Sequence, residues 1–147
     1  MYCLRINLYI KNYDRQDFIM TDKNIKILIV DDFATLRMSL KSLLEQLGYP
    51  EMDEAKDGQE AIDKLKEKDY DLIISDIYKP VMNGFELLDY VKKDDNLKNI
   101  PVIFLTAKAK REKIVESIKA GLDAYITKPF SISTLQQKIE NIFNPEQ

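Results

Sequence analysis

The sequence contains no histidine among its 147 residues. This absence excludes Ser-His-Asp and Cys-His catalysis, zinc sites built on histidine, and any role as a histidine phosphodonor. The single cysteine, Cys3, has no partner for a disulfide or for a cysteine-rich metal site, which fits a reducing compartment such as the cytoplasm. Any chemistry must therefore come from carboxylates, lysines and hydroxyl groups.

Long apolar runs and an excess of basic residues are also missing. No apolar segment approaches the roughly 18 residues that a membrane helix needs, and 22 Lys and Arg residues against 25 Asp and Glu residues give a net charge of -3. We therefore expect a soluble cytoplasmic protein that has neither a membrane nor a nucleic acid as its partner. A chain of this length has room for one ordinary domain.

The first residues differ from the rest of the chain. Residues 1–24 show no clean period, and polar residues interrupt the apolar ones before a signal-peptide core could form. We interpret this stretch as an N-terminal extension that is either flexible or non-native, and one open alternative places residues 1–19 upstream of a natural start at Met20. Residues 25–143 then form the domain and residues 144–147 a short tail. We therefore expect output to pass through a separate partner protein.

Short β-branched runs alternate with segments that carry apolar residues at helical spacing. The predicted strands are 25–30, 51–55, 71–75, 100–105 and 123–127, and the predicted helices are 33–47, 58–68, 84–93, 109–120 and 132–143. The apolar face of the first helix consists of Leu36, Leu40, Leu43, Leu44 and Leu47. Five such units predict an α/β fold with a doubly wound parallel sheet, whose ligands bind beyond the carboxyl ends of the strands.

Polar residues and turn formers stand at these strand ends: Asp31, Asp32, Asp76, Thr106 with Ala107, and Lys128 with Pro129. If the first and third strands are neighbours, three carboxylates converge, and each like-charge pair near 4 Å costs about 4 kcal/mol at an effective dielectric of 20. A bound cation or a raised pKa must offset this repulsion. Hard oxygen ligands with room for water suit Mg²⁺.

A carboxylate beside Mg²⁺ can attack a phosphoryl donor and form an acyl phosphate. Asp76, alone at its strand end, is the predicted nucleophile. Asp32 would hold the metal, and Asp31 would assist through water. Lys128 would pair with the phosphoryl group, and the hydroxyl of Thr106 would donate a hydrogen bond to it.

Each of these residues also has an ordinary structural explanation. Asp31 and Asp32 could be N-cap residues of the next helix. Thr106 could cap another helix, and Lys128 could be a solvated lysine before a tight turn. Their common placement at one edge of one sheet favours the site.

Five segments of the sequence resemble the response-regulator receiver family: ILIVDDFATLR, EAKDGQEAI, LIISDIYKPVMNGFELL, PVIFLTAKAK and AGLDAYITKPF. The similarity extends over residues 25–143 and is greatest to the single-domain chemotaxis regulators of the CheY type. It implies a flavodoxin-like (βα)5 fold with strand order 2-1-3-4-5 and phosphorylation of Asp76 by a partner histidine kinase. It also implies Mg²⁺ bound by Asp32, Asp76 and the backbone carbonyl of Tyr78, with Asp31 assisting, and a cis bond between Lys128 and Pro129.

The resemblance also implies a switch and a partner surface. On phosphorylation Thr106 would move toward the phosphoryl group and Tyr125 would swing inward, although without the family match Tyr125 could be an ordinary aromatic residue. The surface offered to the flagellar motor switch protein would comprise Ala109, Lys110, Arg111, Ile114, Tyr125 and Lys138. A solvated face without a partner is the alternative for these positions.

Two departures from the best-known chemotaxis regulators lie beside the predicted site. Tyr78 and Lys108 stand where those regulators carry Asn and Glu, and both side chains would flank the path of the hydrolytic water. We therefore expect a long-lived acyl phosphate, because a bulky ring would obstruct the water and a cation would pair with phosphoryl oxygens. Lys79 replaces the usual Met, and the sequence supports no prediction from it.

Three functions remain open at this stage. The first is a stand-alone receiver, not an enzyme, that signals to the flagellar motor and has a phosphatase as a further partner. The second is the same receiver in another phosphorelay. The third is a phosphohydrolase of the haloacid dehalogenase type, which also uses Mg²⁺, Thr and Lys. That type expects Asp-x-Asp after its first strand, whereas Phe33 follows Asp31 and Asp32 here.

Overall fold

The structure, a computed structural model, describes residues 22–107 and 110–145. Five parallel strands form one sheet in the order β2-β1-β3-β4-β5. The strands are β1 (Lys26–Val30), β2 (Glu51–Ala55), β3 (Leu72–Asp76), β4 (Val102–Thr106) and β5 (Ala124–Thr127). The helices are α2 (Ala34–Gln46), α3 (Gly58–Glu67), α4 (Gly84–Lys93), α5 (Arg111–Lys119) and α6 (Ile132–Phe143). The predicted flavodoxin-like α/β fold and strand order are confirmed.

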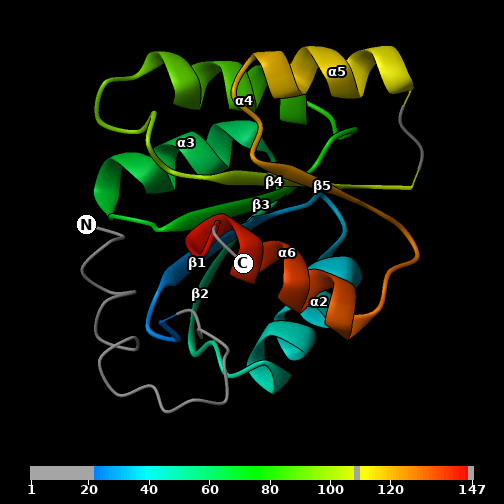
Figure 1. The fold of residues 1–147 in the computed structure, drawn as a ribbon. Coiled ribbons are helices and arrows are strands. Elements are labelled where there is room, and N and C mark those ends of the chain that lie inside the picture. The colour runs from blue at the N-terminus through cyan, green and yellow to red at the C-terminus, as the bar shows by residue number, and fades with distance from the viewer. Residues whose placement is uncertain (1–21, 108–109, 146–147) are drawn as a thin grey trace.

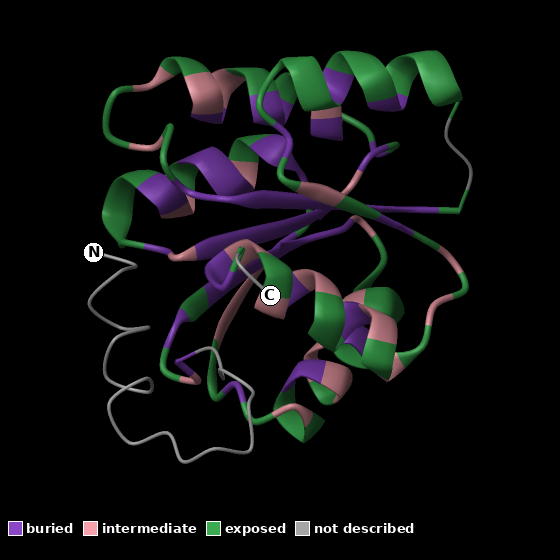
Figure 2. Ribbon diagram, viewed as in Figure 1, coloured by how far each residue is buried: buried purple, intermediate pink, exposed green. Residues whose placement is uncertain are grey.

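Helices cover both faces of the sheet, with α3, α4 and α5 on one side and α2 and α6 on the other (Figure 1). Side chains alternate along each strand, so Leu28 and Val30 of β1 pack toward the first helix layer and Ile27 and Ile29 toward the second. Both layers are apolar, and the central strands β1, β3 and β4 are buried except at Lys26 and Asp76 (Figure 2). The sheet is therefore a rigid support for the residues at its carboxyl edge.

Several predicted boundaries shift by one or two residues. The fourth strand begins at Val102 rather than at residue 100, because Pro101 has no N–H to donate to a neighbouring strand. The helix predicted at 109–120 is observed as α5, which ends at Lys119. Leu36, predicted on the apolar face of the first helix, is 41% exposed. It lies in the first turn of α2, beside the cleft at the carboxyl edge, where no helix covers it.

The loop between β3 and α4 is held closely against the end of β3. Asn83 and Glu86 form a capping box that starts α4. The N–H of Gly84 donates to the backbone oxygen of Ile77 at 2.7 Å. A Cβ at Gly84 would lie 2.9 Å from the backbone oxygen of Asp76, so only glycine allows this close approach. The residue predicted to accept phosphate is therefore in a tightly packed turn.

Parts of the sequence predictions fall outside the described residues. The first 21 residues of the predicted N-terminal extension, the end of the predicted tail at 146–147, and both Lys108 and Ala109 belong to this group. Among the described residues, no helix has the length and apolar character needed to cross a membrane.

Candidate functional site

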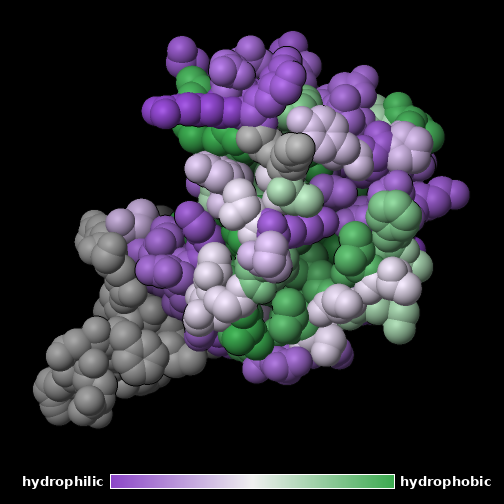
Figure 3. Space-filling view, turned by 90° about the vertical axis from the view of Figure 1, so that its right-hand side faces the viewer, coloured by the Kyte–Doolittle hydropathy of each residue, from purple (hydrophilic) through white to green (hydrophobic). Residues whose placement is uncertain are grey.

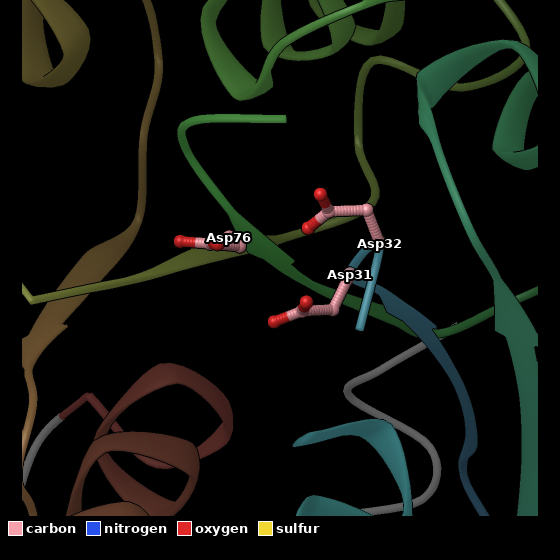
Figure 4. A group of neighbouring side chains, drawn as sticks. All are labelled: Asp31, Asp32 and Asp76. Atoms are coloured by element: carbon pink, nitrogen blue, oxygen red, sulfur yellow. The ribbon is translucent and has the colours of Figure 1, made fainter. Parts of the chain in front are cut away.

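Three carboxylates meet at the carboxyl edge of the sheet. Asp31 and Asp32 follow β1, Asp76 ends β3, and these two strands pair directly. One carboxylate oxygen from each residue lies within 4.8 Å of those of the other two. Figure 4 shows the side chains of Asp31 and Asp32 directed toward the side on which Asp76 lies. The convergence expected from the strand ends is therefore present.

Asp31 is the most buried member of the cluster, with 6% of its surface exposed. Its Oδ1 accepts a hydrogen bond from the N–H of Phe33 at 2.9 Å. Burial raises the pKa of Asp31, and the nearby charges of Asp76 and Asp32 raise it further, whereas Phe33 and Lys128 oppose the shift. Neither Asp31 nor Asp32 caps α2, because the N-cap position is Phe33 and no side chain caps that helix.

The second carboxylate of the cluster, that of Asp32, has an oxygen atom in an unfavourable environment. The Oδ1 atom of Asp32 is buried and has no hydrogen-bond partner among the described residues. A buried carboxylate oxygen without a partner is costly. It lies beside two other carboxylates, and three hard oxygen donors in this arrangement fit a divalent cation such as Mg²⁺.

The carboxylate of Asp76 is held by a hydrogen bond from the next residue of its loop. Its Oδ1 accepts a hydrogen bond from the N–H of Ile77 at 2.9 Å, and its side chain is 14% exposed. The Nζ of Lys128 lies 3.9 Å from Asp76 Oδ1 and 3.8 Å from Asp31 Oδ2. Lys128 therefore faces two members of the cluster and is not a solvated surface lysine. Its bond to Pro129 is cis, as the resemblance implies.

A cleft of about 800 Å³ opens beside Asp76. Its lining includes Phe33, Leu36, Asp76, Tyr78, Thr106, Ala107, Lys110 and Lys128. Thr106 ends β4 and is 1% exposed, and it does not cap α5, whose N-cap is Lys110. Tyr78 is 55% exposed. The hollowed face carries apolar side chains (Figure 3), and Phe33 and Leu36, which line the cleft, are exposed.

The residues predicted as a partner surface do not all lie on the surface. Tyr125 is 38% exposed, and the Nζ of Lys138 lies 5.9 Å from the centre of its ring. Lys110 and Arg111 are exposed at the start of α5. Ile114 is buried in the core, because it lies on the side of α5 that packs on the sheet. Its side chain is therefore not available to a partner in this conformation.

Lys79 is the residue that the sequence reasoning missed. It is 9% exposed, and its Nζ donates to the backbone oxygen of Asp76 at 2.6 Å. Burial lowers the pKa of Lys79 to about 8, although the carboxylates of Asp76, Asp31, Asp32 and Asp57 oppose the shift. The available signal was a lysine three residues after the acceptor, where the family usually has Met.

Replacing Asp31 by Asn should stabilise the metal-free protein at pH 7. The Asn oxygen can still accept from Phe33, and repulsion from the other two carboxylates is relieved by on the order of 1 kcal/mol. The pKa of Asp31 is raised above 3.8 in the folded protein, so the folded state holds this proton more tightly than the unfolded state does. The free energy of unfolding of the wild type therefore falls as pH rises from 3.8 through the folded-state pKa. The difference between the two proteins should disappear below pH 3.8. Urea unfolding with a chelator at several pH values measures it, and equal stability at pH 7 would contradict the expectation.

Comparison with known proteins agrees with this geometry. The family model described as the response regulator receiver domain matches residues 27–140. "Chemotaxis protein CheY-3" of Vibrio cholerae is 47% identical over 122 residues, which cover 83% of this chain and 94% of that protein.

Solved structures show the same fold. The structure of Vibrio cholerae chemotaxis protein CheY4 superposes with a TM-score of 0.75 at 34% identity, covering 81% of this chain and 98% of that one. The receiver domain of a sensor histidine kinase from Pseudomonas aeruginosa, with a magnesium ion coordinated in its active-site cleft, superposes with a TM-score of 0.73 at 28% identity, covering 82% and 98%. The chain belongs to the response regulator receiver domain family.

Proposed function

We propose that residues 25–143 accept a phosphoryl group on Asp76 from the phosphohistidine of a partner kinase and thereby switch binding to an output protein. The observation that carries this proposal is the convergence of Asp31, Asp32 and Asp76 with the Nζ of Lys128 beside an open cleft. The 147 residues include no histidine, so the phosphohistidine donor is not among them. The role is signalling rather than turnover of a substrate.

The proposed transfer forms one bond and breaks another. A carboxylate oxygen of Asp76 attacks phosphorus, and the bond between phosphorus and the donor's imidazole nitrogen breaks. The imidazole leaves with the bonding electron pair and takes up a proton. Lys128 offsets charge on the phosphoryl oxygens, and the hydroxyl of Thr106 can donate a hydrogen bond to one of them. The product is an acyl phosphate on Asp76.

We propose that Asp32, Asp76 and the backbone carbonyl of Tyr78 hold Mg²⁺, with Asp31 assisting through water. The partnerless Oδ1 of Asp32 supports a cation at this position. The magnesium ion in the cleft of the Pseudomonas receiver domain supports the choice of metal. When bound, the ion would supply positive charge to the phosphoryl oxygens.

We further propose that the acyl phosphate hydrolyses slowly. Tyr78 lines the cleft, and its ring makes an edge contact with Phe85 at 6.2 Å between ring centres. The ring therefore lies at the cleft through which the hydrolytic water would have to enter. The matching role of Lys108 stays a prediction, because that residue lies outside the described part of the chain.

For the output, we propose the flagellar motor switch protein. The name of the Vibrio relative as a chemotaxis protein supports this choice, as do the exposed cations Lys110 and Arg111 at the start of α5. Tyr125 would turn inward in the phosphorylated form, which shifts the population toward the binding conformation. Salt-sensitive binding of an acidic, partly apolar peptide by the phosphorylated form alone is expected, and equal binding by both forms would contradict it. A phosphatase partner and a cytoplasmic location stay predictions.

Incubation with acetyl phosphate and Mg²⁺, followed by intact-mass and peptide mass spectrometry, tests the proposed function. The protein should gain one phosphoryl group, located on Asp76. The variant Asp76→Asn should gain none, and Asp63→Asn, on the exposed side of α3, should behave as the wild type. Full labelling of Asp76→Asn would overturn the assignment of the acceptor.

A further inference from the structure

Lys79 places a buried positive charge next to the acidic cluster. It lies in the loop between β3 and α4, and 9% of its surface is exposed. Its Nζ donates to the backbone oxygen of Asp76 at 2.6 Å and to Ser75 Oγ at 2.9 Å. Ser75 is fully buried, and its hydroxyl also donates to the oxygen of Asp76. The ammonium group is therefore anchored to the end of the strand that carries the acceptor.

The partners of this ammonium group are neutral. Within the described residues, Lys79 forms no ion pair with a carboxylate at 4.0 Å or less, whereas Lys128 pairs with both Asp31 and Asp76. Burying a charge on neutral acceptors alone is costly. The ammonium group nevertheless lies next to the cluster, since it is bound to the backbone oxygen of Asp76, whose carboxylate belongs to the cluster.

The two lysines therefore occupy different positions relative to the cluster. Lys128 lines the cleft, and 23% of its side chain is exposed. Its ammonium group is therefore accessible to a phosphoryl group that enters the cleft. Lys79 is buried and is held by hydrogen bonds to Ser75 and to the backbone of Asp76, and it does not line the cleft. A fixed positive charge attracts the carboxylates and repels any cation that they bind.

We propose that Lys79 is an internal counter-cation of the Asp31, Asp32 and Asp76 cluster, which offsets part of their repulsion in the metal-free protein and weakens their binding of Mg²⁺. This inference rests on the metal site proposed above. Lys79 acts as a positioning residue for charge and does not touch the reacting atoms.

Two variants separate the charge of Lys79 from its hydrogen bonds. Lys79→Gln keeps a hydrogen-bond donor on the side chain but removes the charge, and Lys79→Met removes both. If the charge weakens metal binding, both variants should bind Mg²⁺ roughly tenfold more tightly than the wild type. If Lys79 only holds the loop through hydrogen bonds, Lys79→Gln should bind Mg²⁺ as the wild type does.

Isothermal titration of the full chain with Mg²⁺ alone measures these affinities. Urea unfolding with a chelator and with excess Mg²⁺ gives a second readout, since tighter binding increases the stabilisation by the metal. Lys98→Gln is the matched control. Lys98 is exposed, and its Nζ pairs with Asp95 Oδ1 at a distance of 3.4 Å, not with a carboxylate of the cluster. Unchanged or weaker binding by Lys79→Gln overturns the inference. A wild type that binds no Mg²⁺ overturns the proposed metal site instead.

Discussion

Phosphorylation of Asp76 by acetyl phosphate should slow about 100-fold when Lys128 is replaced by Met. Removing one preorganised donor at developing charge commonly costs that much in rate. Among the described residues, Lys128 is the one whose Nζ lies within 4.0 Å of both Asp31 and Asp76. Methionine preserves most of the aliphatic stem, so the loss should reflect the charge. The initial rate of phosphoryl incorporation, followed by intact mass, measures the effect.

The control for this variant is Lys93→Met. Lys93 is exposed at the end of α4 and pairs with Asp89 at 3.0 Å. It should be phosphorylated at the wild-type rate, and any loss of stability should be within a few tenths of a kcal/mol. A rate for Lys128→Met within twofold of the wild type would show that this lysine does not stabilise the transferring group. Mg²⁺ titration checks that the variant still has an intact cluster.

Replacing Asp32 by Asn should have two opposite effects. Affinity for Mg²⁺ should fall on the order of 100-fold, because the variant loses a charged oxygen ligand at the position of the partnerless Oδ1. The free energy of unfolding of the metal-free protein should rise at pH 7, because repulsion from Asp31 and Asp76 is relieved. Calorimetric titration and urea unfolding with a chelator measure the two effects.

This pair of effects distinguishes loss of a ligand from damage to the fold, which would lower both quantities. The matched control is Asp63→Asn, since Asp63 is an exposed carboxylate on α3 whose Oδ1 accepts a hydrogen bond from Gln59 at 3.3 Å. It should leave the Mg²⁺ affinity unchanged. If Asp32→Asn binds Mg²⁺ as tightly as the control does, Asp32 is not a ligand.

The sequence alone predicts those residues of the site that stand at the carboxyl ends of strands. Asp31, Asp32, Asp76 and Thr106 each follow or end a buried run, and parallel strands bring such residues to one edge. The pairing of β1 with β3, which brings the carboxylates within reach, came from the family resemblance. Periodicity alone does not encode strand order.

Residues whose role depends on what packs against them could not be predicted. Leu36 has helical apolar spacing but is exposed, because it lies in the first turn of α2 and lines the open cleft at the carboxyl edge of the sheet. Ile114 resembles a partner-surface residue in its sequence position but is buried.

The amino-acid sequence by itself determined the α/β alternation, the absence of histidine chemistry and the set of polar strand ends. These follow from local periodicity and from residue type. The tertiary structure alone decided that Lys79 is buried against the backbone of Asp76 and that Asp32 has an oxygen without a hydrogen-bond partner in the described part of the chain. The physical reason is that burial and electrostatic environment depend on neighbours from several strands and loops, which a single segment of sequence does not specify.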